Sequence, residues 1–82
     1  MPKITRRRYL LGTVYRCDKN KMLVKASAIP RLGDKVYDGK LREIGYVSNV
    51  LGPASSPFVV VKLTRDVELP EGVEVYGRRE HG

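Results

Sequence analysis

The sequence contains no tryptophan, only one cysteine and only one histidine among its 82 residues. Cys17 cannot form a disulfide within the chain, and the neighbouring Asp18 disfavours the thiolate that a nucleophile needs. His81 is the next-to-last residue, in a polar segment that offers no partner for acid–base chemistry. No cysteines or histidines have the spacing of zinc ligands. We therefore expect no catalytic site, no metal and no cofactor, and we expect a protein that is not an enzyme.

Long apolar segments are also absent. No run approaches the ~20 apolar residues of a membrane-spanning helix, and none has the composition of a signal peptide. We therefore expect a cytoplasmic protein without membrane contact. No glycine pattern of a phosphate-binding loop opens a helix, so a small-molecule substrate is not expected either.

The chain length predicts one domain with a modest core. We expect a basic N-terminal leader over residues 1–8, one β-barrel domain over residues 9–77 and a polar C-terminal tail over residues 78–82.

The net charge of +7 is concentrated at the ends of the chain. Residues 1–8 carry four basic and no acidic side chains, whereas residues 9–77 carry ten basic and eight acidic ones. The domain is therefore close to neutral, although binding of phosphates requires clustered lysine and arginine. The candidate RNA-contacting residues are Arg6, Arg7 and Arg8. The alternative is a solvated leader that keeps the protein soluble.

Short runs of β-branched and aromatic residues alternate with glycine, proline and aspartate along the chain. Apolar residues nowhere recur at helical spacing over the ~11 residues that a helix requires. The expected strands are residues 9–16, 22–26, 35–37, 41–51, 58–61 and 73–76. Six short strands in so small a chain predict an all-β fold, a six-stranded antiparallel barrel, because closure removes exposed sheet edges.

Two glycines mark particular backbone features. Gly12, inside an expected strand, predicts a β-bulge or a close approach of another backbone. The dipeptide Asp38-Gly39, between two expected strands, predicts a type I′ turn with positive φ at both residues.

The segment from Ile44 to Leu63 predicts a strand, a loop and a second strand. The loop, residues 52–57, contains two prolines that fix φ and stiffen it. Such a loop either connects the strands and does nothing more, or it displays a rigid surface to a partner.

Alternation along the strand before this loop places apolar residues on both of its faces. Ile44, Tyr46, Ser48 and Val50 are expected on one face, and Gly45, Val47, Asn49 and Leu51 on the other. After the loop, Val59 and Val61 suit a core, whereas Phe58 and Val60 need a second apolar neighbour. The candidate partner-binding residues are Ile44, Gly45, Val47, Val50, Leu51, Gly52, Pro53, Pro57, Phe58 and Val60.

The order of several segments resembles the archaeal form of the glycine-arginine-rich protein of H/ACA ribonucleoproteins. The segments are LGTV at 11–14, MLVK at 22–25, PRLGDKVYD at 30–38, IGYV at 44–47 and LGPASSPFVVV at 51–61. The most specific part is the Gly-Pro-x-x-x-Pro-aromatic pattern that follows Ile-Gly-x-Val. Phe58 stands where the family is expected to have tyrosine, and the glycine-arginine tails of the eukaryotic members are absent.

This resemblance implies a six-stranded Greek-key barrel similar to those of translation-factor domains, without catalytic activity of its own. It implies a subunit that binds the catalytic pseudouridine synthase, touches guide RNA little or not at all, and helps to load substrate RNA and release product during rRNA pseudouridylation. The residues by themselves leave two alternatives open, an independent RNA-binding barrel that uses its basic ends and a translation-factor-like module. The partner with which the protein copurifies would separate the three.

Overall fold

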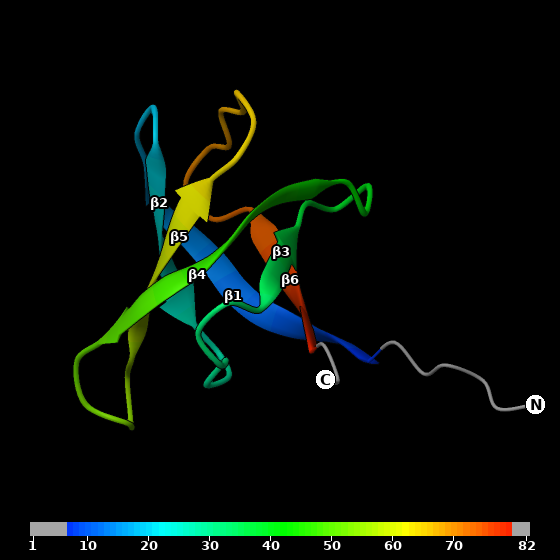
Figure 1. The fold of residues 1–82 in the computed structure, drawn as a ribbon. Helices are drawn as coiled ribbons and strands as arrows, with labels where there is room; N and C mark the ends of the chain where they lie inside the picture. The colour runs from blue at the N-terminus through cyan, green and yellow to red at the C-terminus, as the bar shows by residue number, and fades with distance from the viewer. Residues whose placement is uncertain (1–6, 80–82) are drawn as a thin grey trace, which may run out of the picture.

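The computed structural model describes residues 7–79, which form a closed antiparallel barrel (Figure 1). Its strands are β1 (Arg7–Cys17), β2 (Lys21–Ala26), β3 (Lys35–Tyr37), β4 (Glu43–Leu51), β5 (Phe58–Leu63) and β6 (Glu74–Arg79). The predicted six-stranded all-β barrel is confirmed, and each expected strand overlaps an observed one. Strand pairing begins at Arg7 and ends at Arg79, beyond the expected barrel limits of 9–77. No helix in the described part of the chain is long and apolar enough to cross a membrane.

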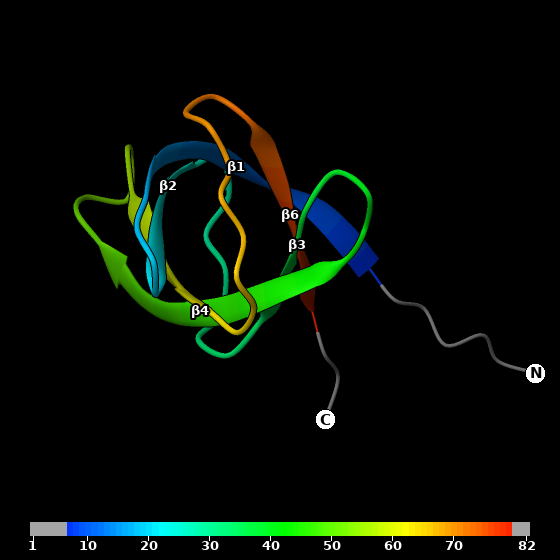
Figure 2. The same ribbon diagram turned by 90° about the horizontal axis from the view of Figure 1, so that it is seen from above.

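The strand order around the barrel is β1-β2-β5-β4-β3-β6, and β6 pairs with β1 to close it (Figure 2). Strands β3, β4 and β5 are successive neighbours, and β2 returns to lie beside β5, which is the Greek-key arrangement. The β2–β5, β3–β6 and β1–β6 pairs join strands that are distant in sequence. Each face of the barrel therefore combines residues from separate parts of the chain.

Small branched side chains fill the interior, and every strand contributes to it. The fully buried residues are Leu11, Val14, Met22, Val24, Val36, Ile44, Val47, Val59, Val61 and Val75. Valine dominates because a β-branched side chain suits both a strand backbone and a narrow barrel interior.

Two glycines allow strands to approach closely. A Cβ atom on Gly12 would overlap the carbonyl oxygen of Lys25 on β2, and one on Gly45 would overlap the carbonyl oxygen of Lys62 on β5. The β1–β6 register also shifts between Leu10 and Gly12, as at a β-bulge. The predicted role of Gly12 is confirmed, and bulges and glycines of this kind supply the curvature that closes a small barrel.

The turn between β3 and β4 differs from the predicted type I′ turn. Neither Asp38 nor Gly39 has positive φ, whereas Leu41 has φ of 64°. The Leu41 N–H donates to the Asp38 carbonyl at 2.9 Å, and the Asp38 N–H donates to the Arg42 carbonyl at 3.1 Å. These bonds enclose a three-residue loop whose last residue is left-handed. The predicted turn was therefore wrong, because the aspartate side chain holds a longer loop, as described below.

Candidate interaction surfaces

Two of the candidate partner-binding residues lie inside the barrel. Ile44 is 0% exposed and Val47 is 1% exposed, so neither side chain is on the surface. The predicted division of β4 into two alternating faces was wrong, because the register shifts at bulges opposite Val36 and between Val47 and Asn49. Each bulge resets which side chains point inward.

Gly45 and Pro57 are also buried. Gly45 was a candidate partner-binding residue, but the backbone that approaches it closely belongs to Lys62 within the barrel. Its lack of a side chain is therefore required for the pairing of β4 with β5.

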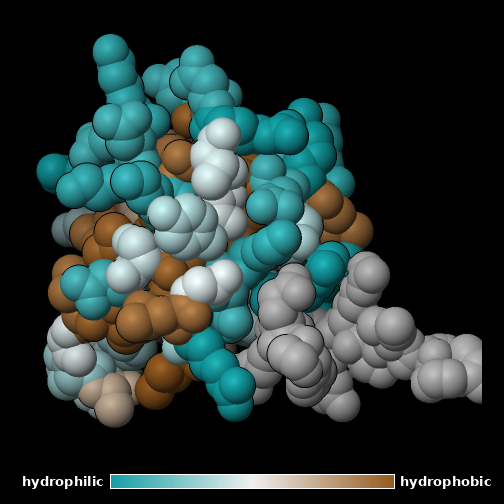
Figure 3. Space-filling view, viewed as in Figure 1, coloured by the Kyte–Doolittle hydropathy of each residue, from teal (hydrophilic) through white to brown (hydrophobic). Residues whose placement is uncertain are grey.

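Five outward side chains from four strands form a continuous surface, which we call the apolar face: Tyr15, Leu23, Leu51, Phe58 and Val60. Leu23 pairs directly with Val60, and Leu51 pairs with Phe58. The Tyr15 and Phe58 rings meet edge to face, with centroids 5.3 Å apart. Tyr15 is 48% exposed and Leu51 45%. Figure 3 shows hydrophobic surface on the side of the molecule where β4, β5 and their loop lie.

The loop between β4 and β5 borders the apolar face and spans residues 52–57, as predicted. The Ser56 N–H donates to the Pro53 carbonyl at 3.0 Å, which closes a turn inside the loop. Gly52 has φ of 87°, a conformation that glycine adopts without strain. Gly52 and Pro53 are exposed, so they can take part in a surface centred on the two adjacent strands.

Sequence reasoning missed Tyr15 and Leu23, which belong to β1 and β2. Alternation around Met22 and Val24 could have placed Leu23 on the outside, since both of those residues suit a core. Its position beside Val60 depends on the pairing of β2 with β5, which no local pattern in the sequence indicates.

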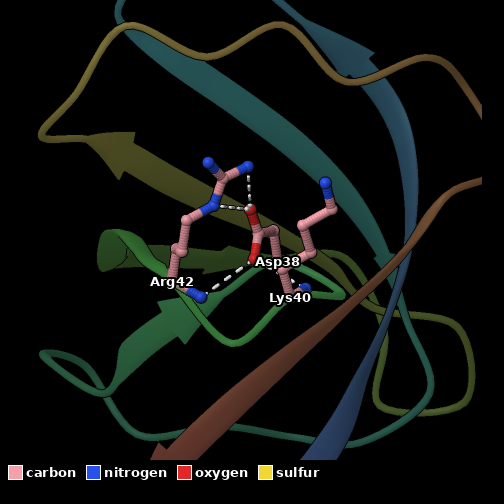
Figure 4. Close-up of polar contacts among 3 residues, drawn as sticks. All are labelled: Asp38, Lys40 and Arg42. Carbon is pink, nitrogen blue, oxygen red and sulfur yellow. Dashed lines mark hydrogen bonds and ion pairs between the residues drawn. The ribbon is translucent and has the colours of Figure 1, made fainter.

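The carboxylate of Asp38 holds the β3–β4 loop (Figure 4). It accepts hydrogen bonds from the backbone N–H groups of Lys40 and Arg42, both at 2.9 Å, and from Arg42 Nε at 3.1 Å. Burial opposes ionisation and raises the pKa of Asp38, but these hydrogen bonds and the Arg42 charge together outweigh it and hold the pKa below its ordinary value. The positive charge of Arg42 is thereby neutralised by Asp38, which is nearly buried.

Basic residues occupy neighbouring register positions where β1, β6 and β3 run side by side. Arg7 pairs with Arg79, Arg8 pairs with Arg78, and Arg78 also pairs with Lys35. The basic ends expected from the sequence are thus brought together, and a lysine from within the domain joins them. Of the candidate RNA-contacting residues, Arg8 is exposed, while Arg6 and the side chain of Arg7 lie outside the described part of the structure.

No three histidine, cysteine, aspartate or glutamate residues within the described range are close enough to hold a metal ion. Tyr76 donates a 3.2 Å hydrogen bond to Glu74, and this bond together with the carboxylate charge raises the pKa of the Tyr76 phenol.

A family model described as the Gar1/Naf1 RNA binding region matches residues 9–80, which include nearly the whole barrel. The chain belongs to the Gar1/Naf1 family. Comparison with curated protein sequences gives no match. The expected membership among the glycine-arginine-rich proteins of H/ACA ribonucleoproteins is confirmed, and the archaeal origin stays a prediction. The Gar1/Naf1 assignment indicates an accessory, RNA-binding role in an H/ACA ribonucleoprotein.

Proposed function

We propose that this chain is a noncatalytic subunit that binds the catalytic pseudouridine synthase of the H/ACA particle through its apolar face. The observation that carries the proposal is the continuity of that face: four strands each turn at least one large apolar side chain outward onto it. Apolar surface of this kind on a small domain, rimmed by polar residues, is typical of a protein-binding site.

The architecture of the face suits tight binding. Phe58 is held by the edge-to-face contact with Tyr15, so its ring is ordered before a partner arrives. The adjoining proline-containing loop is likewise preorganised, which limits the conformational entropy lost on docking. Lys21 and Lys62 form a directly opposed pair two residues beyond Leu23 and Val60, and both are exposed. They supply the polar rim that surrounds the apolar centre of many interfaces.

An accessory barrel bound to the synthase acts by positioning RNA and protein, because the chemical step belongs to the catalytic subunit. We assign it to assisting the loading of substrate RNA and the release of product. These are the steps in which a noncatalytic subunit changes turnover without changing the bond-making step.

The test uses the full chain, coexpressed with the synthase, carrying Val60→Asp or Phe58→Asp. A charge at the centre of the apolar face should abolish copurification, because losing a buried anchor costs at least ~2 kcal/mol, about thirtyfold in affinity. In the reconstituted particle, multiple-turnover modification should fall more than single-turnover modification.

The matched control is Leu32→Asp, which introduces the same charge at a 68% exposed leucine in the β2–β3 connection. It should bind the synthase like the wild type, and circular dichroism should show that all three variants fold. If folded Val60→Asp and Phe58→Asp copurify as well as Leu32→Asp, the docking face lies elsewhere.

The second candidate function is an independent RNA-binding module, which the opposed arginine pairs of β1 and β6 favour. It predicts an affinity for bare guide RNA comparable to the affinity for the synthase. Titrations of both ligands under the same salt conditions therefore distinguish the two functions.

A further inference from the structure

We propose that the outer face of β1, β6 and β3 holds a segment of single-stranded RNA, at a site separate from the apolar face. The proposal rests on the proposed function in one respect, since that function brings the chain beside guide and substrate RNA. It assigns the RNA-binding role of the family to particular residues of this chain.

The first support is a row of three basic residues, which we call the basic row: Arg8, Arg78 and Lys35. They are direct register partners on adjacent strands, so their side chains share one face and follow each other at the ~4.8 Å spacing of strands. Like charges placed directly opposite each other destabilise a sheet. A bound polyanion would relieve this repulsion, and phosphates at successive nucleotides form such a polyanion.

The described acidic residues around Lys35 and Arg8 have identified partners, and Glu74 accepts the Tyr76 hydroxyl at 3.2 Å. Glu43 approaches Lys35 at 3.9 Å, but both side chains are more than two-fifths exposed, and such pairs are weak. Asp38 is bonded to Arg42 within its own loop. Asp34 is almost fully buried and accepts the Tyr9 hydroxyl at 2.8 Å. Arg8 and Lys35 therefore both place positive charge on this face, and the ion pair of Lys35 is a weak, exposed one.

The second support is apolar surface beside the basic row. Leu10, Tyr76 and Tyr37 are register partners two residues further along the same strands. Leu10 is 38% exposed and Tyr76 is partly exposed, whereas Tyr37 is only 9% exposed and lies beneath the Arg78 guanidinium. An open hollow of about 410 Å³ is lined in part by Arg8, Leu10, Leu41 and Tyr76. Single-stranded nucleic acid is held in this manner elsewhere, with phosphates on basic residues and bases against aromatic and apolar side chains.

The third support is the conformation of Leu41, which lines this hollow and an adjoining one of about 240 Å³. A leucine with φ of 64° is strained, yet its side chain is 49% exposed and no core contact compensates the strain. The Asp38 carboxylate holds the loop that presents it. In the smaller hollow the Arg78 guanidinium lies 5.6 Å from the centre of the Tyr37 ring, which orients that cation on the face.

This face and the apolar face lie on different sides of the barrel. Figures 1 and 2 both place the start of β1 and the end of β6 on the side away from the β4–β5 loop. RNA and a protein partner can therefore bind at the same time.

The test is fluorescence anisotropy of the full chain with a labelled 12-nucleotide oligouridine RNA, at several salt concentrations. The test variant is Arg8→Ala with Lys35→Ala; Arg78 is kept because it packs on Tyr37. The control is Lys19→Ala with Arg65→Ala, which removes the same charge from exposed positions next to β2 and β5 at the other end of the barrel. Tyr76→Ala tests the apolar surface beside the basic row.

We expect the Arg8 and Lys35 variant to weaken binding at least about tenfold and to lower the salt slope by about 0.7 for each phosphate contact removed. Tyr76→Ala should weaken binding about tenfold and leave the salt slope unchanged, since stacking carries no charge. The control should change affinity less than about twofold.

Equal losses in the variant and the control, or no binding of the RNA by the wild type, would overturn the proposal. The same variants are tested for copurification with the synthase, which all should retain. Loss of the synthase with unchanged RNA affinity would mean that this face binds protein instead. If the wild type fails to bind the synthase, the proposed function fails while the RNA titration still decides this inference.

Discussion

The hydroxyl of Tyr9 donates a 2.8 Å hydrogen bond to the carboxylate of Asp34, which joins β1 to the turn before β3. Strand β6 lies between these two strands, and Gly77 is the β6 residue directly opposite Tyr9. A Cβ atom on Gly77 would overlap the tyrosine ring. Because Gly77 has no side chain, the Tyr9 ring can lie across β6 and reach the carboxylate of Asp34. Asp34 also accepts the Arg31 N–H, which fixes the turn itself.

Tyr9→Phe should destabilise the barrel by about 1–3 kcal/mol, because it leaves a nearly buried carboxylate with one hydrogen bond fewer. Urea denaturation followed by circular dichroism measures the change. Tyr15→Phe is the matched control, since that ring is half exposed and its ring contact with Phe58 does not involve the hydroxyl. Similar stability for the two variants would show that the Tyr9 hydrogen bond adds nothing to the fold.

An added side chain should destabilise the barrel much more at Gly45 than at Gly39. Gly45→Ala should cost about 2 kcal/mol or more, because the new methyl group would overlap the Lys62 carbonyl and push β4 from β5. Gly39→Val should change stability by less than about 1 kcal/mol, since φ is not positive there and nothing lies within 4 Å of the added Cβ. Thermal melts of both variants provide the comparison. A loss of stability well above 1 kcal/mol in the Gly39 variant would instead support the type I′ turn that the sequence predicts.

The sequence predicts the number and places of the strands because turn residues separate runs of strand-forming residues at close intervals. It also predicts the stiff loop after Leu51 and the inward side chains of β5, since that strand alternates without interruption. These features depend on local chemistry alone.

The candidate surface was predicted less well because bulges and strand pairing are not local. Ile44 and Val47 lie in the core because β4 changes register, and the sequence marks neither bulge. Tyr15 and Leu23 join Phe58 and Val60 only after β2 pairs with β5. The type I′ turn predicted from the Asp38-Gly39 dipeptide does not form, because the aspartate carboxylate accepts hydrogen bonds from two backbone N–H groups. These bonds favour a longer loop.

Leu41→Gly should leave the barrel folded and raise its stability by up to about 1 kcal/mol, because glycine adopts φ of 64° without a steric penalty. The leucine is half exposed, so little core contact is lost. Leu10→Gly is the control, since Leu10 is also partly exposed but lies within β1, where glycine weakens a strand. Urea titrations should give shifts of opposite sign for the two variants. A destabilised Leu41→Gly protein would mean that this side chain contributes packing that outweighs its strain.

The last prediction concerns acid stability and Asp38. Its folded pKa lies below the ordinary value of 3.8, so the folded state binds this proton less readily than the unfolded chain does. The carboxylate therefore stabilises the fold fully above the unfolded pKa, and this contribution is lost as pH falls through the folded pKa.

Asp38→Asn keeps an oxygen for the Lys40 and Arg42 N–H groups but removes the charge and the 3.1 Å ion pair with Arg42. The free energy of unfolding should therefore be higher for the wild type near pH 7, and the gap should narrow as pH falls below about 4. Asp66→Asn is the control, because it removes the same charge from an exposed position in the β5–β6 connection. Urea denaturation across this pH range gives the difference in the free energy of unfolding between the wild type and each variant. A gap for Asp38→Asn that does not change with pH would show that the lost hydrogen-bond geometry, and not the ionised carboxylate, carries the effect.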